Sequence, residues 1–377
     1  MKIVCSTNMP YAKEAFGTLG DTVFLPERAI TAADVKDADI LAIRSTTKVT
    51  RELLEGSRVK FVGTATIGTD HMDLNYLDSA GIPWCYSPGC NANSVSEYFT
   101  AALLCLATRH KFRLEGMTVG VIGVGNVGSL VVKKARTLGM RALQNDPPRR
   151  RAIEARAQRH EFVELDHVLK ESEIISFHVP LTRIGTDITH NMANQKLFAR
   201  LQPGCILINA ARGGVVRTND LFAAMDKGIV TRTVIDTWEG EPAFRADMLK
   251  RADIGTPHIA GHSFEGKAYG TLMVYQEACR VLGVPATWTL DNMWPAPPVP
   301  EIELDAAGRR EEDVLWEIVR KVYDIEADDR RLRSVEGAPA DLAKHFDQLR
   351  QNYPMRREFR FTKVTAHNAP EKIRTRI

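Results

Sequence analysis

A glycine-rich turn limits the fold of this chain more than any other feature. The segment "VIGVGNVGSLVVKKARTLG" places Gly123, Gly125 and Gly128 in the order G-x-G-x-x-G, after an apolar strand pattern and at the start of a helical one. The first glycine permits a tight turn, the second lets the backbone approach a pyrophosphate, and the third lets helix and strand pack closely. The turn therefore predicts a dinucleotide site, to which we also assign Asn126 and Val127.

A carboxylate follows this turn at a spacing that distinguishes between nicotinamide cofactors. Asp146, in "LQNDPP", ends the next strand pattern about 20 residues on, where a carboxylate accepts hydrogen bonds from the ribose hydroxyls. Its charge repels the 2′-phosphate of NADP. The arginines at 149–151 would suit NADP, but Asp146 lies nearer to the expected ribose position. The sequence therefore predicts NAD as the cofactor.

Two series of strand-like runs, separated by helical patterns, follow one another along the chain. The first comprises residues 2–7, 21–26, 38–45, 59–66 and 82–87. The second comprises "MTVGVIGVG", "RALQND", "EIISFHVP", "GCILINAAR", "TRTVIDTW" and "DIGTPHI". Strands that alternate with helices predict parallel sheets built from βα units. We therefore expect two Rossmann-like, doubly wound α/β domains.

A long helix is predicted over 91–112, where apolar residues recur at helical spacing. Asn93 or Ser94 would be its N-cap, with Glu97 as the capping-box partner if Ser94 is the cap. This helix would carry the chain from one domain into the next.

The pattern changes at a proline-rich connector, "WPAPPVP" (294–300), which precedes charged helical stretches. We therefore predict a third, smaller α+β domain. The expected boundaries are 1–93 plus 258–285 for a substrate-binding domain, 94–257 for the NAD-binding domain, and 286–377 for the C-terminal domain.

Composition excludes several classes of protein. The 377 residues are 44% hydrophobic and 26% charged, as in globular proteins of two or three domains. A net charge of +3 is too small to predict a nucleic-acid partner, although local basic clusters at 147–156 and 353–360 leave an anionic ligand open. The six cysteines form no C-x-x-C pair, and no apolar run is long enough for a membrane span or a signal peptide. We therefore expect a cytoplasmic protein without a membrane partner.

Two histidines four residues apart raise the question of a metal site. His258 and His262 lie in "DIGTPHIAGHSF". Pro257 and Gly261 disfavour a helix here, and no glutamate lies between the histidines, as a helical zinc motif would require. The sequence therefore predicts no metal.

Polar residues follow three successive strands of the second series. They are Arg212 in "LINAARGGVV", Asp236 and Glu241 in "VIDTWEGEP", and His258 in "GTPHIAG". In an open α/β sheet, ligands bind beyond the carboxyl ends of the strands. The fragments match the patterns N-x-x-R-G, D-x-x-x-x-E-P and P-H-I-x-G, and with them the chain resembles the D-isomer-specific 2-hydroxyacid dehydrogenase family over nearly its whole length.

The resemblance implies a role for each of these residues. His258 would be the general base, Glu241 would orient its ring and favour the imidazolium, and Arg212 would bind the substrate carboxylate. It also implies further contacts. The cofactor would be bound by Ala210, Ala211, Arg212, Asp236 and Gly261, and the substrate by Ser45, Thr66 and His262.

The tail, with "KVYDIEADDRRLR" and "FDQLRQNYPMRREF", resembles that of family members in pyridoxal 5′-phosphate (vitamin B6) biosynthesis. The resemblance implies oxidation of 4-phospho-D-erythronate to 2-oxo-3-hydroxy-4-phosphobutanoate and a homodimer formed through the C-terminal domain. Its apolar positions (Val314, Leu315, Ile318, Val322) would equally suit a self-contained core. Candidates for the substrate phosphate are Arg44 and, across a dimer, Arg356 and Arg357.

Two alternatives remain open at the level of sequence. One is a dehydrogenase of another 2-hydroxy acid, such as 3-phosphoglycerate. The other is a non-enzymatic, NADH-sensing protein that resembles transcriptional corepressors.

Overall fold

The computed structural model describes residues 1–335 and 339–376. In this part of the chain, the strands form three parallel sheets within two compact units. The first unit comprises Met1–Ala92 and His262–Ala296, and the second comprises Asn93–Gly261 and Pro297–Ile377. The predicted α/β class, with two Rossmann-like domains and a small C-terminal domain, is confirmed, whereas the predicted boundaries of three domains stay a prediction.

The first unit contains a five-stranded sheet in the order β2-β1-β3-β4-β5. Its strands are β1 (Lys2–Ser6), β2 (Asp21–Leu25), β3 (Ile40–Ile43), β4 (Phe61–Thr64) and β5 (Trp84–Cys85). Successive side chains of a strand point to opposite faces, so Ile40 packs on α1 (Ala12–Phe16) and α12 (Phe264–Leu282), and Leu41 packs on the other face. That other face is covered by α2 (Ala32–Val35), α3 (Arg51–Leu54) and α4 (Leu74–Ser79).

The second unit contains a six-stranded sheet in the order β11-β10-β9-β8-β6-β7. Its strands are β6 (Thr118–Ile122), β7 (Arg141–Asn145), β8 (Ile174–Phe177), β9 (Cys205–Asn209), β10 (Val230–Ile235) and β11 (Ile254–Gly255). A parallel bridge between Gln144 and Phe162 extends the sheet beyond β7. The strand order reverses between β6 and β8, which places the glycine turn after β6 at the switch point where such sheets bind ligands.

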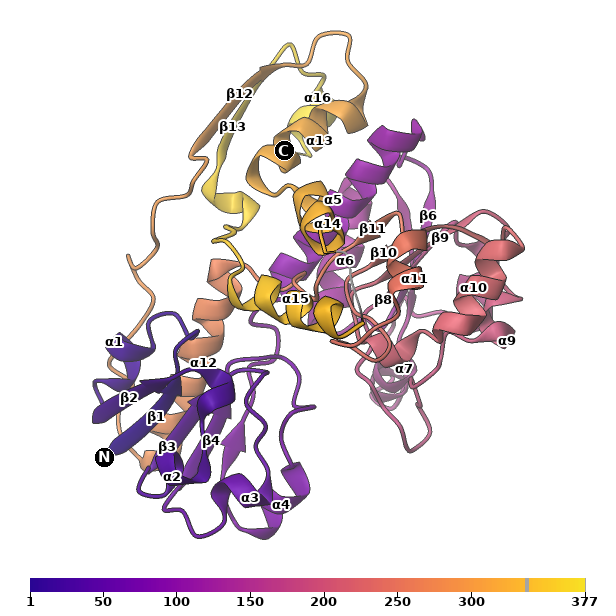
Figure 1. Cartoon of the computed structure of the whole chain (residues 1–377). Coiled ribbons are helices and arrows are strands. Elements are labelled where there is room, and N and C mark those ends of the chain that lie inside the picture. The colour runs from indigo at the N-terminus through magenta and orange to yellow at the C-terminus, as the bar shows by residue number, and fades with distance from the viewer. Residues whose placement is uncertain (336–338, 377) are drawn as a thin grey trace. The chain divides into compact units, whose positions relative to one another are not determined.

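Helices cover both faces of this sheet (Figure 1). One face packs on α5 (Ala92–His110) and α6 (Asn126–Thr137). The other packs on α8 (Leu165–Glu171), α9 (Gln195–Phe198), α10 (Thr218–Asp226) and α11 (Ala246–Arg251). The shorter α7 (Pro147–Glu154) has no buried residue. Short 3-10 turns among the described residues are η1 (Glu27–Ala29), η2 (Gly213–Val215) and η3 (Phe359–Phe361).

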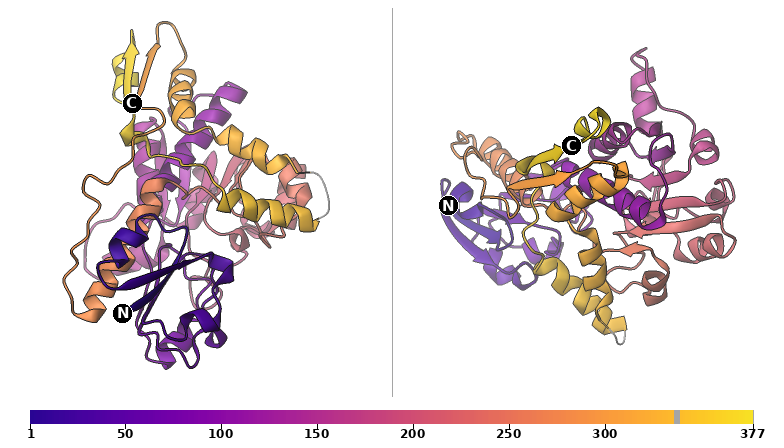
Figure 2. Two further views of the ribbon diagram at one scale, coloured as in Figure 1. Left: turned by 60° about the vertical axis from the view of Figure 1, so that its left-hand side comes forward. Right: turned by 90° about the horizontal axis from the view of Figure 1, so that it is seen from above.

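The C-terminal segment, from Pro297 onward, contributes side chains to both hydrophobic cores of the second unit. It consists of β12 (Glu301–Asp305), α13 (Glu311–Val322), α14 (Ile325–Arg333), α15 (Pro339–Gln351), β13 (Lys363–His367) and α16 (Glu371–Arg374), with β12 and β13 paired in parallel (Figure 2). Val314, Leu315 and Ile318 are buried in the same core as α5 and α6, while Leu332 and Phe346 join the core on the opposite face. The apolar positions of the tail are therefore used within its own chain, and the dimer stays a prediction.

The helices α5 and α12 have 19 residues each. Both are largely buried within the unit to which they belong. In the described part of the chain, no helix combines the length and the apolar character needed to cross a membrane.

The start of α5 differs from the sequence prediction. The helix begins at Ala92, so Asn93 and Ser94 lie inside it, and the predicted N-cap and capping box are wrong. Ser94 Oγ donates instead to Glu358 Oε1 (3.3 Å), and Glu97 Oε1 accepts from Asn93 Nδ2 (3.0 Å) and Phe359 N (3.0 Å). Burial, together with the nearby Glu358 charge, raises the pKa of Glu97 to about 8. Ser94 and Glu97, which predicted the start of the helix, thus form hydrogen bonds with Glu358 and Phe359 of the C-terminal segment.

Candidate active site

The residues predicted to bind cofactor and to catalyse gather at one edge of the six-stranded sheet. Gly123 follows β6, Asp146 follows β7, Asp236 follows β10, and Arg212 and His258 each lie three residues beyond the ends of β9 and β11. All strands of the sheet are parallel, so their carboxyl ends meet at the same edge. The fold therefore brings these five residues to the edge where open α/β sheets bind ligands.

The glycine turn has the geometry that a dinucleotide requires. Gly123 has a φ of 86°, which favours glycine, and its N–H donates to Asn145 O (2.9 Å). A Cβ at Gly128 would lie 2.0 Å from Gly123 O, whereas a Cβ at Gly125 would meet no atom within 4 Å. Asn126 and Val127 begin α6, whose N-terminus favours an anion. These residues fit the pyrophosphate of NAD.

Asp146 connects this turn to the next helix. Its Oδ2 accepts from Val124 N (2.8 Å), and its Oδ1 accepts from Arg149 N (3.0 Å) as the N-cap of α7. Arg149 donates to Val124 O, while Arg150 and Arg151 pair with carboxylates of the same unit. The carboxylate is therefore fixed beside the glycine turn, and the three arginines that would suit NADP have protein partners.

The glycines of the turn provide a first prediction. Gly128→Ala is expected to lower both NADH affinity and stability, because its Cβ would displace α6 from the backbone of Gly123. Gly125→Ala should leave the thermal unfolding midpoint unchanged and raise the dissociation constant of NADH about tenfold or more, since its side chain blocks only the approaching pyrophosphate. Fluorescence titration and thermal unfolding of both variants test this. Equal loss of stability in the two variants would contradict it.

His258 and Glu241 form a hydrogen-bonded pair. The ring Nδ1 lies within hydrogen-bond distance of Glu241 Oε1, and the side chains are 28% and 23% exposed. Burial would raise the pKa of Glu241, but the charge of His258 and hydrogen bonds from its ring and from Trp238 N outweigh burial and hold the pKa below its usual value. An ionised carboxylate only accepts, so we assign the Nδ1 proton to His258. Nε2 of the neutral ring is then a proton acceptor.

Neighbouring groups fix this pair. Trp238 N donates to Glu241 Oε2 (2.9 Å), and Trp238 Nε1 donates to Thr256 O (2.9 Å). Neither Trp238 nor Thr256 is among the residues predicted from sequence, where the aromatic residue inside "DTWEGEP" is the one signal for Trp238.

Asp236 lies beneath the loop that carries His258 and is 1% exposed. Its Oδ1 accepts from Ile259 N (2.8 Å) and Thr256 Oγ1 (2.6 Å), and its Oδ2 accepts from Ala260 N (3.0 Å). The carboxylate therefore supports the backbone of the loop. Contact with the cofactor stays a prediction for Asp236, and also for Gly261, which ends this loop.

Arg212 lies in a loop that Asn209 fixes. Asn209 Oδ1 accepts from Ala211 N (3.2 Å), and its Nδ2 donates to Arg212 O (3.2 Å). Arg212 Nη1 donates to Ala211 O (2.9 Å). A Cβ at Gly213 would lie 1.8 Å from Trp238 O, so this loop packs directly on the segment that holds Glu241. Ala210 is the first residue of the loop.

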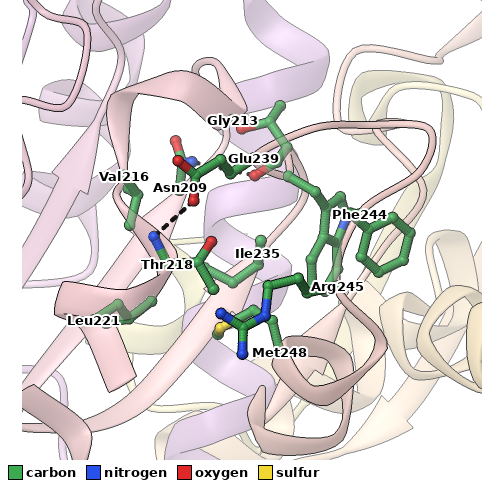
Figure 3. A pocket seen from close by; sticks show the side chains of 12 residues that line it. Asn209, Gly213, Val216, Thr218, Leu221, Ile235, Glu239, Phe244, Arg245 and Met248 are labelled. Carbon is green, nitrogen blue, oxygen red and sulfur yellow. Dashed lines mark hydrogen bonds between the residues drawn. The ribbon is translucent and has the colours of Figure 1, made fainter. Parts of the chain in front are cut away.

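A small cavity lies under the same loop (Figure 3). Its lining includes Gly213, Glu239 and Phe244, and Thr218 N donates across it to Glu239 Oε2 (2.9 Å). Its volume of about 10 Å³ is at the lower limit for one water molecule. This cavity is therefore a packing gap and not a ligand site.

The residues predicted to bind substrate belong to the first unit. Ser45 and Thr66 follow the carboxyl ends of the neighbouring strands β3 and β4, so the sheet brings them to one edge. Ser45 is exposed, whereas Thr66 Oγ1 donates to Gly68 O (2.8 Å). His262 precedes Ser263, whose Oγ accepts from Gly266 N (2.9 Å) as the N-cap of α12. Substrate contact stays a prediction for all three residues.

Two further expectations can be compared with the structure. Arg356 and Arg357 are 4% and 1% exposed, and Arg356 donates to backbone carbonyls of its own chain. The expectation that they reach a substrate phosphate across a dimer is therefore wrong for this arrangement, because both side chains are buried and Arg356 already donates to carbonyl oxygens of its own chain. Within residues 1–335 and 339–376, no group of three or more His, Cys, Asp or Glu side chains could hold a metal ion.

Comparison with protein families gives two matches. Residues 105–260 match the D-isomer specific 2-hydroxyacid dehydrogenase, NAD binding domain, and residues 293–375 match a domain of unknown function. The chain is 45% identical over 359 residues to erythronate-4-phosphate dehydrogenase of Cronobacter sakazakii, which covers 95% of this chain and 92% of that protein. It is 44% identical, with the same coverage, to the enzyme of the same name from Escherichia coli.

Solved structures resemble about three quarters of the chain. A D-lactate dehydrogenase from Aquifex aeolicus, complexed with NAD and lactic acid, has a TM-score of 0.61 at 26% identity, covering 74% of this chain and 96% of that one. An NAD-dependent formate dehydrogenase from Staphylococcus aureus, in complex with NAD, has a TM-score of 0.61 at 22% identity, covering 75% and 96%. These solved structures share the fold, and the relatives that match along 95% of the chain at 44–45% identity show that it belongs to the erythronate-4-phosphate dehydrogenases of the D-isomer-specific 2-hydroxyacid dehydrogenase family.

Proposed function

We propose that this chain oxidises 4-phospho-D-erythronate to 2-oxo-3-hydroxy-4-phosphobutanoate with NAD, as a step of pyridoxal 5′-phosphate biosynthesis. The observation that carries the proposal is the His258–Glu241 pair at the carboxyl edge of a dinucleotide-binding sheet. The similarity to enzymes named for this substrate covers 95% of the chain, whereas the solved D-lactate dehydrogenase covers 74%.

The chemistry requires a base and a hydride acceptor. NAD, when bound, accepts the hydride from C2 of the substrate. His258 Nε2 takes the proton of the C2 hydroxyl, so that hydroxyl becomes the carbonyl of the product. Glu241 keeps the Nδ1 proton in place and stabilises the positive charge that develops on the ring. The 4-phosphate and C4 take no part in bond making or breaking.

Arg212 binds the substrate carboxylate and polarises the C2 oxygen in this proposal. A guanidinium offers two parallel donors to a carboxylate, whereas an ammonium offers a point charge. Arg212→Lys is therefore expected to lower kcat/KM about 10²-fold, with NADH affinity within about threefold of the parent. Steady-state kinetics with varied substrate and NADH titration measure both quantities. Unchanged kcat/KM would show that Arg212 does not contact substrate.

The assay that tests the function compares three substrates. Purified protein receives 4-phosphoerythronate, 3-phosphoglycerate or D-lactate, and nicotinamide reduction is followed with and without a 2-oxo acid acceptor. We expect a preference for 4-phosphoerythronate. A preference for 3-phosphoglycerate would favour the dehydrogenase alternative, and inert substrates with intact NADH binding would favour the NADH-sensing alternative.

The proposal includes a homodimer formed through the C-terminal segment, in the cytoplasm. The paired strands β12 and β13 have one exposed face, and each of the six cysteines is a free thiol, as in a reducing compartment. Light scattering of the full chain tests the dimer. We expect twice the chain mass of 42.0 kDa. A mass of one chain at micromolar concentration would contradict it.

A further inference from the structure

The C-terminal segment covers the sheet edge from which the His258 loop emerges. In the second unit, β11 is the outermost strand, and α14 lies beside it (Figure 1). Asp329 Oδ1 accepts a hydrogen bond from Gly255 N (2.7 Å), the last residue of that strand. Arg333 binds Asp329 and donates to two carbonyl oxygens at the end of α11 (2.6 and 2.7 Å). The backbone is thus fixed by the tail immediately before the His258 loop.

His258 has a backbone conformation that must be held from outside. Its φ is 53°, in the left-handed region that a residue with a side chain rarely adopts. Such a conformation persists where the surrounding structure determines it from several directions. The position of the ring, and with it the hydrogen bond to Glu241, depends on that backbone.

Two distant side chains hold the two peptides that follow His258. From the amide side, Asp236 accepts from Ile259 N (2.8 Å) and Ala260 N (3.0 Å). From the carbonyl side, Arg356 Nη2 donates to Ala260 O (3.1 Å), and Nη1 donates to Ile259 O (3.5 Å). The backbone N–H and C=O groups of both Ile259 and Ala260 therefore each have a side-chain hydrogen-bond partner.

Arg356 is itself held by several contacts. It is 4% exposed, and its guanidinium lies over the ring of Tyr323 at 4.0 Å. Its Nη2 also donates to Ser94 O (2.6 Å) in α5, which ties the guanidinium to that helix. A planar donor fixed in this way transmits the position of α5 and of the tail to the loop.

Open space borders the loop at its first residue, Pro257. A cavity of about 230 Å³ lies beside Pro257, lined also by Leu349, Tyr353 and Pro354 of the tail. Residues that border open space lose the contacts that would hold them. The hydrogen bonds of Arg356 therefore add a directional restraint on Ile259 and Ala260 to the packing of these two residues in the core.

We propose that Arg356 is a positioning residue for the reaction, which holds the Ile259 and Ala260 peptides so that His258 meets Glu241 and presents Nε2. The C-terminal segment then serves catalysis within its own chain. This inference rests on the proposed function, in which His258 is the base.

The test uses Arg356→Lys in the full chain, with Arg330→Lys as the matched control. Lysine retains the charge but cannot reach Ser94, Ile259 and Ala260 carbonyls together. Arg330 belongs to the same tail, and its side chain is 60% exposed. We measure hydrogen–deuterium exchange of residues 255–263 without substrate, and kcat, KM and NADH affinity with 4-phosphoerythronate.

For Arg356→Lys, we expect exchange of residues 255–263 to quicken about tenfold while exchange of β9 and β10 stays unchanged. We expect kcat to fall about 10–100-fold, with KM and the NADH dissociation constant within about threefold. Unchanged local exchange, or faster exchange throughout the unit, overturns the proposal. If the parent enzyme lacks the activity but local exchange still quickens, the proposed function fails, and the contact of Arg356 with the loop stands.

If Arg356→Lys does not fold, Tyr323→Leu takes its place, because it removes the ring beneath the guanidinium and keeps the arginine. The expected changes have the same direction and a smaller size. A folded Tyr323→Leu with parental exchange at 255–263 and parental kcat overturns the proposal.

Discussion

Replacing His258 by asparagine is expected to lower kcat about 10²–10⁴-fold, the usual contribution of a general base. Asparagine approximates the size of the ring and accepts no proton from the substrate at neutral pH. The glycine turn and Asp146 lie on other loops of the same sheet edge, so NADH should bind with a dissociation constant within about threefold of the parent. Steady-state kinetics and NADH fluorescence give the two quantities.

Glu241→Gln tests the same pair from its other side. The amide can donate to Nδ1, which would place the ring proton on Nε2 and remove the acceptor that the substrate hydroxyl needs. A fall in kcat about as large as that of the histidine variant is expected, as for the corresponding change in a serine protease triad. His367→Asn is the matched control, because His367 lies on β13 with its side chain 52% exposed. Activity retained by the His258 variant would exclude that residue as the base.

The second large effect concerns stability and pH. Glu97 has a pKa of about 8 in the folded protein, because burial and Glu358 disfavour its charge, against an ordinary value of 4.5 in the unfolded chain. Between these values the folded state holds one more proton than the unfolded state, so the free energy of unfolding falls as pH rises. Glu97→Gln stays neutral throughout. We expect the parent to lose about 2–4 kcal/mol relative to this variant between pH 5 and pH 8.

Denaturant unfolding of both proteins at several pH values measures this difference. Other titrating groups contribute equally to both proteins and cancel in the comparison. Glu301→Gln is the control, since that side chain is 71% exposed on β12. Parallel curves for the parent and Glu97→Gln would show that the carboxyl group stays charged in the fold.

The strands were predictable from sequence because each is a short apolar run between turn residues. The runs that begin at Lys2 and Thr118 have the composition of strands buried on both faces, and the structure buries nearly all of their residues. The glycine turn was predictable because its spacing serves a backbone geometry that few other residues allow. The common location of Arg212, Asp236 and His258 at one sheet edge was predictable because the strands of the sheet are parallel.

The contacts of the tail could not be predicted in the same way. Ser94 and Glu97 have the local pattern of a capping box, yet their partners lie 264 and 262 residues away. Arg356 belongs to a basic cluster that resembles a solvated surface, and its burial depends on acceptors in α5 and beyond β11. Local patterns carry no information on such partners, because the partners are set by tertiary packing.

The second unit is built from two stretches of chain separated by part of the first unit, and this has a consequence for synthesis. A ribosome working at about 5–20 residues per second needs roughly 5–20 s to add the roughly 100 residues between His258 and Arg356. During that interval the glycine turn and the strands of its sheet have been synthesised, while the loop after β11 lacks its tail contacts. The nascent chain therefore contains the glycine turn before it contains the arginine that holds the loop of the base, and a chain that ends before Arg356 is expected to lack that restraint on His258.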